Sequence, residues 1–132
     1  MKRTELREHI FKVLFGVEFN AEQEMPEQLQ LYFEQLEDAR EKDLDYIRTK
    51  SSKIAEKIAE IDSLINEHTT GWKTSRMNKV DLTILRFAVY EMKWDEDVPT
   101  GVAIDEAVEL AKKYSSDEGP AFINAVLGKL AE

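Results

Sequence analysis

The chain has 132 residues, of which 42% are hydrophobic and 34% charged, so it is long enough for one domain with its own core. Its formal net charge of −9 argues against nonspecific coating of nucleic acid. The sequence has no cysteine, no apolar run long enough to span a membrane and no secretory signal, which indicates a cytoplasmic protein without disulfides or membrane segments.

The charges are unevenly distributed along the chain. Residues 1–17 contain four basic and two acidic side chains, whereas residues 18–67 contain six basic and fourteen acidic ones. An acidic protein with a basic end can bind nucleic acid on one face.

Residues 3–19 are predicted to form a helix, because apolar side chains recur there at helical spacing. One apolar stripe ends at Val17, and a second contains Phe11, Phe15 and Phe19. Two stripes indicate a helix that lies in the core or also contacts a partner.

Two further helices are predicted in the first half of the chain. Pro26 suits the first turn of a short helix that ends near residue 39. Asp43 is the predicted cap of a long helix that ends before Gly71.

The second half is predicted to contain three helices. Asn78 is the predicted N-cap of a helix that reaches about Met92. The next helix runs from about Val102 to Lys113, and Pro120 starts the last one. Because no segment alternates with period two, the sequence predicts an all-α fold.

The sequence contains no catalytic motif. His9 and His68 lie on different elements without carboxylates at metal-ligand spacing, and we interpret both as solvated or packed side chains. Glu106 and Glu109 are three residues apart on a helix, but such pairs are common on exposed surfaces. We therefore expect a binding protein that is not an enzyme and needs no cofactor or metal.

Basic residues near the N-terminus are candidates for phosphate binding. Arg3 and Arg7 are four residues apart on the first helix, and Lys2 extends that side. Such a row can follow a phosphate backbone. Pairing of the same side chains with neighbouring acids is the alternative.

Phe122 lies in the first turn of the last helix, where free N–H groups attract anions and an aromatic ring can stack on an unpaired base. Asn124 adds a hydrogen-bond donor and acceptor nearby. On spacing alone, Phe122 could instead belong to the core together with Val126.

Five segments of the second half occur in a characteristic order and spacing: Trp72 with Arg76, Ile84–Glu91, Val98–Pro99, Ile104–Lys112 and Phe122–Leu127. At the N-terminus, Arg3, Arg7 and Leu14–Phe15 fit the same pattern more loosely. In these features the chain resembles the NusB family of bacterial transcription antitermination factors over nearly its whole length.

The resemblance implies one domain, residues 1–132, built as a bundle of about six or seven helices in two packed subdomains, 1–70 and 71–132. NusB-like proteins pair with NusE, a protein of the small ribosomal subunit. The pair binds the boxA element of ribosomal RNA leader transcripts, in an antitermination complex on RNA polymerase. By the family's pattern, RNA contacts are expected at Lys2, Arg3, Arg7, Phe122 and Asn124, and NusE contacts at Phe15 and Asp81.

Two features depart from the family's pattern. Thr4 and Glu5 separate Arg3 from Arg7, where the family often has further arginines, and this lowers the expected phosphate-binding charge. Asp105 replaces the usual asparagine. A carboxylate there would repel phosphate if the position touches RNA, but would serve nearly as well as asparagine in bracing a helix.

Two other functions can be compared with RNA binding. A protein-binding helical adaptor with little or no RNA binding of its own is consistent with the acidic balance. The same helical domain occurs fused to ribosomal RNA methyltransferases, but 132 residues leave no room for their cofactor-binding domain. The aromatic stripe of the first helix also permits a homodimer through the face that meets NusE.

Overall fold

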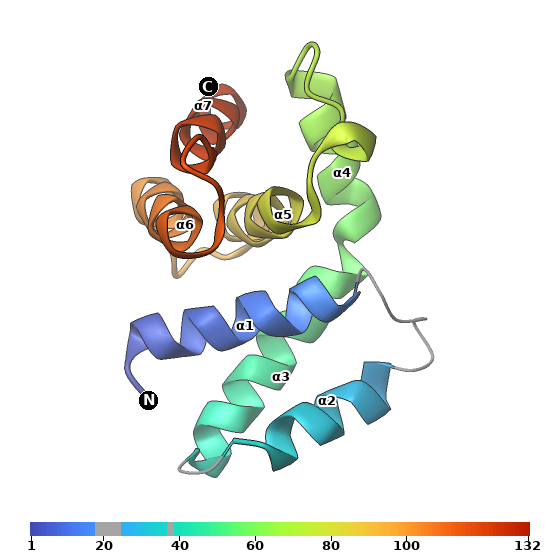
Figure 1. Cartoon of the computed structure of the whole chain (residues 1–132), viewed down its shortest axis with the longest axis vertical. Helices are drawn as coiled ribbons and strands as arrows, with labels where there is room; N and C mark the ends of the chain where they lie inside the picture. The colour runs from blue at the N-terminus through green and yellow to red at the C-terminus, as the bar shows by residue number, and fades with distance from the viewer. Residues whose placement is uncertain (18–24, 37–38) are drawn as a thin grey trace. The chain divides into compact units, whose positions relative to one another are not determined.

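The computed structural model describes residues 1–17, 25–36 and 39–132, and Phe19 lies outside these ranges. The described residues form seven α-helices and the short 3-10 helix η2, and they contain no strand, which confirms the all-α prediction. The elements are α1 (Arg3–Val17), α2 (Met25–Glu34), α3 (Glu41–Glu56), α4 (Ile58–His68), η2 (Thr74–Arg76), α5 (Lys79–Trp94), α6 (Thr100–Tyr114) and α7 (Gly119–Ala131) (Figure 1). None of these helices combines the length and the apolar character that a membrane crossing requires.

The chain divides into two compact units, Met1–Glu56 and Lys57–Glu132. In the first unit α1 packs on α3, and α2 contacts α1. In the second unit α5, α6 and α7 pack on one another, and α4 packs against α5 and α7 (Figure 1). The sequence places the boundary at residue 70, whereas the contacts place it before α4, because α4 packs with the C-terminal helices.

The prediction of one long helix from Asp43 to the end of α4 is wrong. The helix is interrupted at Lys57, whose backbone has φ −101° and ψ 2°. No glycine or proline marks this position, and the buried side chains Ile47, Ile54 and Ile61 continue through it at seven-residue intervals. The two halves pack against different helices, and this is a tertiary effect that the local sequence does not show.

Asp43 lies in the first turn of α3 and is not the cap of that helix. Its buried carboxylate accepts a hydrogen bond from the N-terminal ammonium group of Met1, with an N–O distance of 2.9 Å. This ion pair ties the start of the chain to α3.

A histidine–tyrosine contact joins α1 to α2. The His9 Nδ1 atom lies 2.5 Å from the Tyr32 hydroxyl oxygen, and the two rings meet edge to face with their centroids 5.8 Å apart. Burial, together with the positive charge of Lys12, lowers the pKa of His9. The neutral imidazole is therefore favoured at this position.

The core of the second unit follows the predicted apolar faces. α5 is its most buried helix, and α6 contributes three alanines and a leucine to the core. The guanidinium of Arg86 on α5 donates two hydrogen bonds to the Asp62 carboxylate on α4, at 2.9 and 2.7 Å. This bidentate pair fixes α4 against α5.

Candidate functional site

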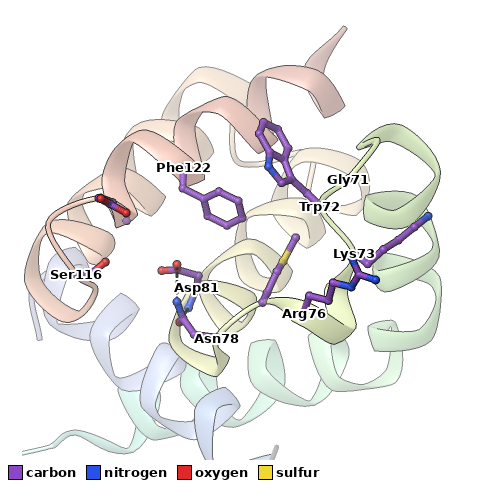
Figure 2. A pocket seen from close by; sticks show the side chains of 11 residues that line it. Gly71, Trp72, Lys73, Arg76, Asn78, Asp81, Ser116 and Phe122 are labelled. Atoms are coloured by element: carbon purple, nitrogen blue, oxygen red, sulfur yellow. Dashed lines mark hydrogen bonds between the residues drawn. The ribbon is translucent and has the colours of Figure 1, made fainter.

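A pocket of about 320 Å³ opens on the second unit, where the chain between α4 and α5 faces the start of α7 (Figure 2). Its walls combine aromatic, cationic and acidic side chains with two glycines. The lining residues are Gly71, Trp72, Lys73, Arg76, Met77, Asn78, Asp81, Ser116, Glu118, Gly119 and Phe122.

Two aromatic rings meet at this pocket. Phe122 enters it from α7, and Trp72 enters it from the segment before η2 (Figure 2). Their ring centroids are 5.6 Å apart and their planes are inclined at 79°, which is a favourable edge-to-face geometry. Trp72 is 37% exposed, and Phe122 is half-buried.

Phe122 does not lie on the core face of α7. The core face of α7 consists of the fully buried Ile123, Val126 and Leu127, and Phe122 turns aside from that face toward the pocket (Figure 2). The ring is therefore half-buried at the pocket and does not belong to the fully buried core face of α7.

Charges of both signs border the aromatic pair. Lys73 and Arg76 are exposed cations on the side of η2, and Asp81 and Glu118 are the carboxylates of the pocket. Exposed cations beside an exposed ring and a half-buried ring suit a nucleotide, since the cations attract its phosphate while a ring contacts its base.

Sequence reasoning did not name Trp72, Lys73 or Arg76 as site residues. Trp72 and Arg76 were among the residues that carry the family resemblance, but neither was assigned a role in binding. Their spacing of four residues would place them on one side of a regular helix. The structure instead places Trp72 before η2 and Arg76 at the end of η2, in the connection between α4 and α5.

Asp81 is the centre of a hydrogen-bonding network that joins the start of α5 to the end of α6. Asn78 is the N-cap of α5, as predicted, and its Oδ1 accepts from the Asp81 backbone N–H at 2.9 Å. The Asp81 carboxylate accepts in return from Asn78 Nδ2 at 2.8 Å and from the Ser115 hydroxyl at 2.6 Å. Ser115 is the C-cap of α6, so Asp81 couples the start of α5 to the chain that leads into α7.

Gly119 lies so close to Ser115 that there is no room for a side chain at position 119. A Cβ atom on Gly119 would lie 2.5 Å from Ser115 Cβ, and still closer to Ser115 Oγ. Glycine is therefore required here by space. The start of α7, which carries Phe122, rests directly on Ser115.

The predicted basic row on α1 is not uniform. Lys2 and Arg3 are exposed, whereas Arg7 is only 5% exposed. Arg7 shares its side of the helix with the buried Ile10 and Leu14, three and seven residues further on. Lys2 and Arg3 therefore present their charges to solvent, and Arg7 does not.

The remaining predicted residues lie on both units. Phe15 on α1 is half-buried, and its ring stacks on Phe11 with the centroids 6.1 Å apart. Asn124 on α7 is exposed but does not line the pocket. Of the seven predicted residues, the structure brings Phe122 and Asp81 together on one pocket.

The sequence matches the NusB family over residues 4–132. The transcription antitermination protein NusB of Agathobacter rectalis is 53% identical over 131 residues, which cover 99% of this chain and 100% of that protein. The transcription antitermination protein NusB of Lachnoclostridium phytofermentans is 44% identical over 132 residues, which cover 100% of both chains.

Solved structures show the same fold. The NusB structure of T. maritima has a TM-score of 0.85 and 32% sequence identity, covering 99% of this chain and 91% of that one. A chain in the crystal structure of the antitermination factors NusB and NusE in complex with dsRNA has a TM-score of 0.84 and 25% identity, covering 98% of this chain and 95% of that one. The sequence match over nearly the whole chain and the shared helical fold lead to one conclusion: this chain belongs to the NusB family.

Proposed function

We propose that the protein is a transcription antitermination factor that binds boxA RNA of ribosomal RNA leader transcripts together with NusE, within an antitermination complex on RNA polymerase. Three findings support this. Its relatives are antitermination proteins over their full length. A structural neighbour is bound to NusE and double-stranded RNA. The observation on this chain that carries the proposal is the half-buried Phe122 ring, held at a pocket beside exposed cations.

In this proposal the predicted residues have separate tasks. Lys2 and Arg3 contact phosphates from the start of α1, and Arg7 contributes its charge from a buried position. Phe122 stacks on an unpaired base, and the exposed Asn124 hydrogen-bonds to RNA nearby. Phe15 and Asp81 contact NusE.

The Asp81 carboxylate already accepts hydrogen bonds from Asn78 and Ser115. A contact with NusE would therefore add to this network, because a carboxylate can accept further hydrogen bonds at its remaining lone pairs. The protein would act by binding alone, without catalysis, in the cytoplasm where ribosomal RNA is transcribed.

The test is RNA binding with and without NusE, with boxA compared with a scrambled RNA of the same composition. Phe122→Ala should weaken boxA binding about tenfold or more, since stacking contributes roughly 1–3 kcal/mol per base. Tyr46→Ala is the matched control, because Tyr46 is an aromatic residue with 45% exposure on α3 and is outside the pocket. Unchanged affinity in a folded Phe122→Ala protein would remove Phe122 from the RNA site.

The acidic net charge of −9 favours a second candidate, a helical adaptor that binds protein partners with little RNA contact of its own. Titration at two salt concentrations separates the two functions, since phosphate contacts make affinity fall steeply with salt. No boxA signal with NusE present, at either salt concentration, would favour the adaptor. Sedimentation of the free protein would test a homodimer formed through the Phe15 side of α1.

A further inference from the structure

The segment that carries Trp72 is held firmly from its N-terminal side. Gly71 adopts a positive φ of 86°, which turns the chain after α4. The Trp72 backbone N–H donates to the Thr69 carbonyl oxygen at 3.4 Å. The buried Thr69 hydroxyl lies 2.5 Å from the Ile65 carbonyl oxygen and 3.0 Å from that of Trp72.

The same segment is tied to α4 from its C-terminal side. Asn66 Oδ1 accepts from the Thr74 backbone N–H at 2.9 Å, and Asn66 Nδ2 donates to the Thr74 hydroxyl at 3.3 Å. The backbone is thus anchored both before and after Trp72. The anchored segment carries the Trp72 side chain, which remains 37% exposed. Core packing alone therefore does not account for the position of this side chain.

On this anchored segment, the Trp72 ring lies edge to face with the Phe122 ring, with the centroids 5.6 Å apart and the planes inclined at 79°. Phe122 comes from α7, on the opposite wall of the pocket (Figure 2). An edge-to-face neighbour restricts the rotation of a half-buried ring and favours one orientation. A ring that is already oriented loses less entropy when a base stacks on it.

We propose that Trp72 is a positioning residue that holds the Phe122 ring in the orientation in which it stacks on an RNA base. This inference rests on the proposed function. It assigns Trp72 an effect that passes through Phe122, with Thr69 and Asn66 bracing the segment. It also gives a role to the hydrogen bonds that hold this segment beside the pocket.

A double-mutant cycle tests this proposal. Affinity for boxA RNA is measured in the presence of NusE for the full-length wild type, Trp72→Ala, Phe122→Ala and the double variant. Trp72→Ala should weaken binding by about two- to tenfold, the range expected from one aromatic pair. In the Phe122→Ala background the same change should cause no further loss.

Two further variants of Trp72 distinguish the effect of an aromatic ring, which can orient Phe122, from the effect of apolar bulk alone. Trp72→Phe retains an aromatic ring and should restore most of the affinity, whereas Trp72→Leu retains an apolar side chain and should not. Trp72→Leu also serves if Trp72→Ala fails to fold. In the Trp94→Phe protein Trp72 is the single tryptophan, because the chain contains two. In this protein, Phe122→Ala should change the fluorescence emission of Trp72 even in the absence of RNA.

The outcomes distinguish this inference from the proposed function. If wild type shows no preference for boxA over the scrambled RNA, the proposed function fails and the inference fails with it. If wild type binds boxA and Trp72→Ala binds equally well, only the inference is overturned. Additive losses in the double variant would also overturn it, since Trp72 would then act independently of Phe122.

Discussion

Replacing Gly119 by alanine should destabilise the second unit through a single steric conflict. The new Cβ atom would lie 2.5 Å from Ser115 Cβ, and neither atom is at the end of a flexible side chain. The backbone of α7 or of the Ser115 turn must therefore move. Either movement disturbs the hydrogen bond of 2.6 Å between the Ser115 hydroxyl and the Asp81 carboxylate.

The magnitude follows from the two disturbed interactions. Overpacking at a close contact costs about 1–3 kcal/mol, and loss of a hydrogen bond to a charged group costs about 1.5–3 kcal/mol. A small gain from the helix preference of alanine offsets part of this loss. We expect the free energy of unfolding to fall by about 2–5 kcal/mol, a large fraction of the ~5–15 kcal/mol typical of a domain.

Urea unfolding followed by tryptophan fluorescence measures this loss directly, because both tryptophans, Trp72 and Trp94, belong to the second unit. Gly128→Ala is the matched control on the same helix. A Cβ atom on Gly128 would meet nothing within 4 Å, so this change should raise the free energy of unfolding by about 0.5–1 kcal/mol.

A second substitution isolates the cause. Ser115→Gly removes the Cβ and Oγ atoms that Gly119→Ala would strike, and the remaining contact to Asp81 Oδ1 is an ordinary 3.5 Å. In the Ser115→Gly background, Gly119→Ala should therefore cost less than about 1 kcal/mol. A Gly119→Ala protein as stable as wild type, or an equal cost in both backgrounds, would refute the steric argument.

Two further predictions concern the ion pair and the histidine. Arg86→Met should lower the free energy of unfolding by about 2–3 kcal/mol, because it leaves the partly buried Asp62 without its bidentate partner. Lys112→Met, which breaks an exposed pair at 3.0 Å, should change it by less than about 0.5 kcal/mol, and equal effects would contradict the role of burial. Since the pKa of His9 is lowered in the folded protein, the unfolded chain binds the proton more readily, so stability should fall as the pH drops below 6.5. Circular dichroism of urea unfolding at about pH 7.5 and about pH 5.5 should show a smaller difference for His9→Gln than for wild type, and an equal difference would contradict this assignment.

Local sequence signals located most helix ends in the described chain. Asn78 was predicted as an N-cap and is one, Pro120 lies in the first turn of α7, and Gly71 follows the end of α4 with a positive φ. These signals are reliable because each depends on the conformation of a few adjacent residues. The interruption at Lys57 was missed, because it depends on which helices α3 and α4 contact.

The candidate site was predictable only in part. Phe122 was recognised from its place in a helix start and from the family's motif, but spacing alone could not separate a core ring from a surface ring. Arg7 and Arg3 looked alike in sequence, yet one is buried and the other exposed. Exposure depends on what packs against a helix, and a four-residue spacing carries no such information.

The sequence by itself determined the helical class, the family and the residue types available for binding, because periodicity, caps and ordered motifs are written in neighbouring residues. Only the tertiary structure decided that Trp72 meets Phe122, that Asp81 joins Asn78 to Ser115, and that position 119 has no room for a side chain. The Trp72–Phe122 and Asp81–Ser115 contacts join residues 50 and 34 positions apart, whereas Asn78–Asp81 and Ser115–Gly119 are three and four positions apart. Their geometry is set by the packing of α4, α5, α6 and α7, so it exists only once those helices have assembled.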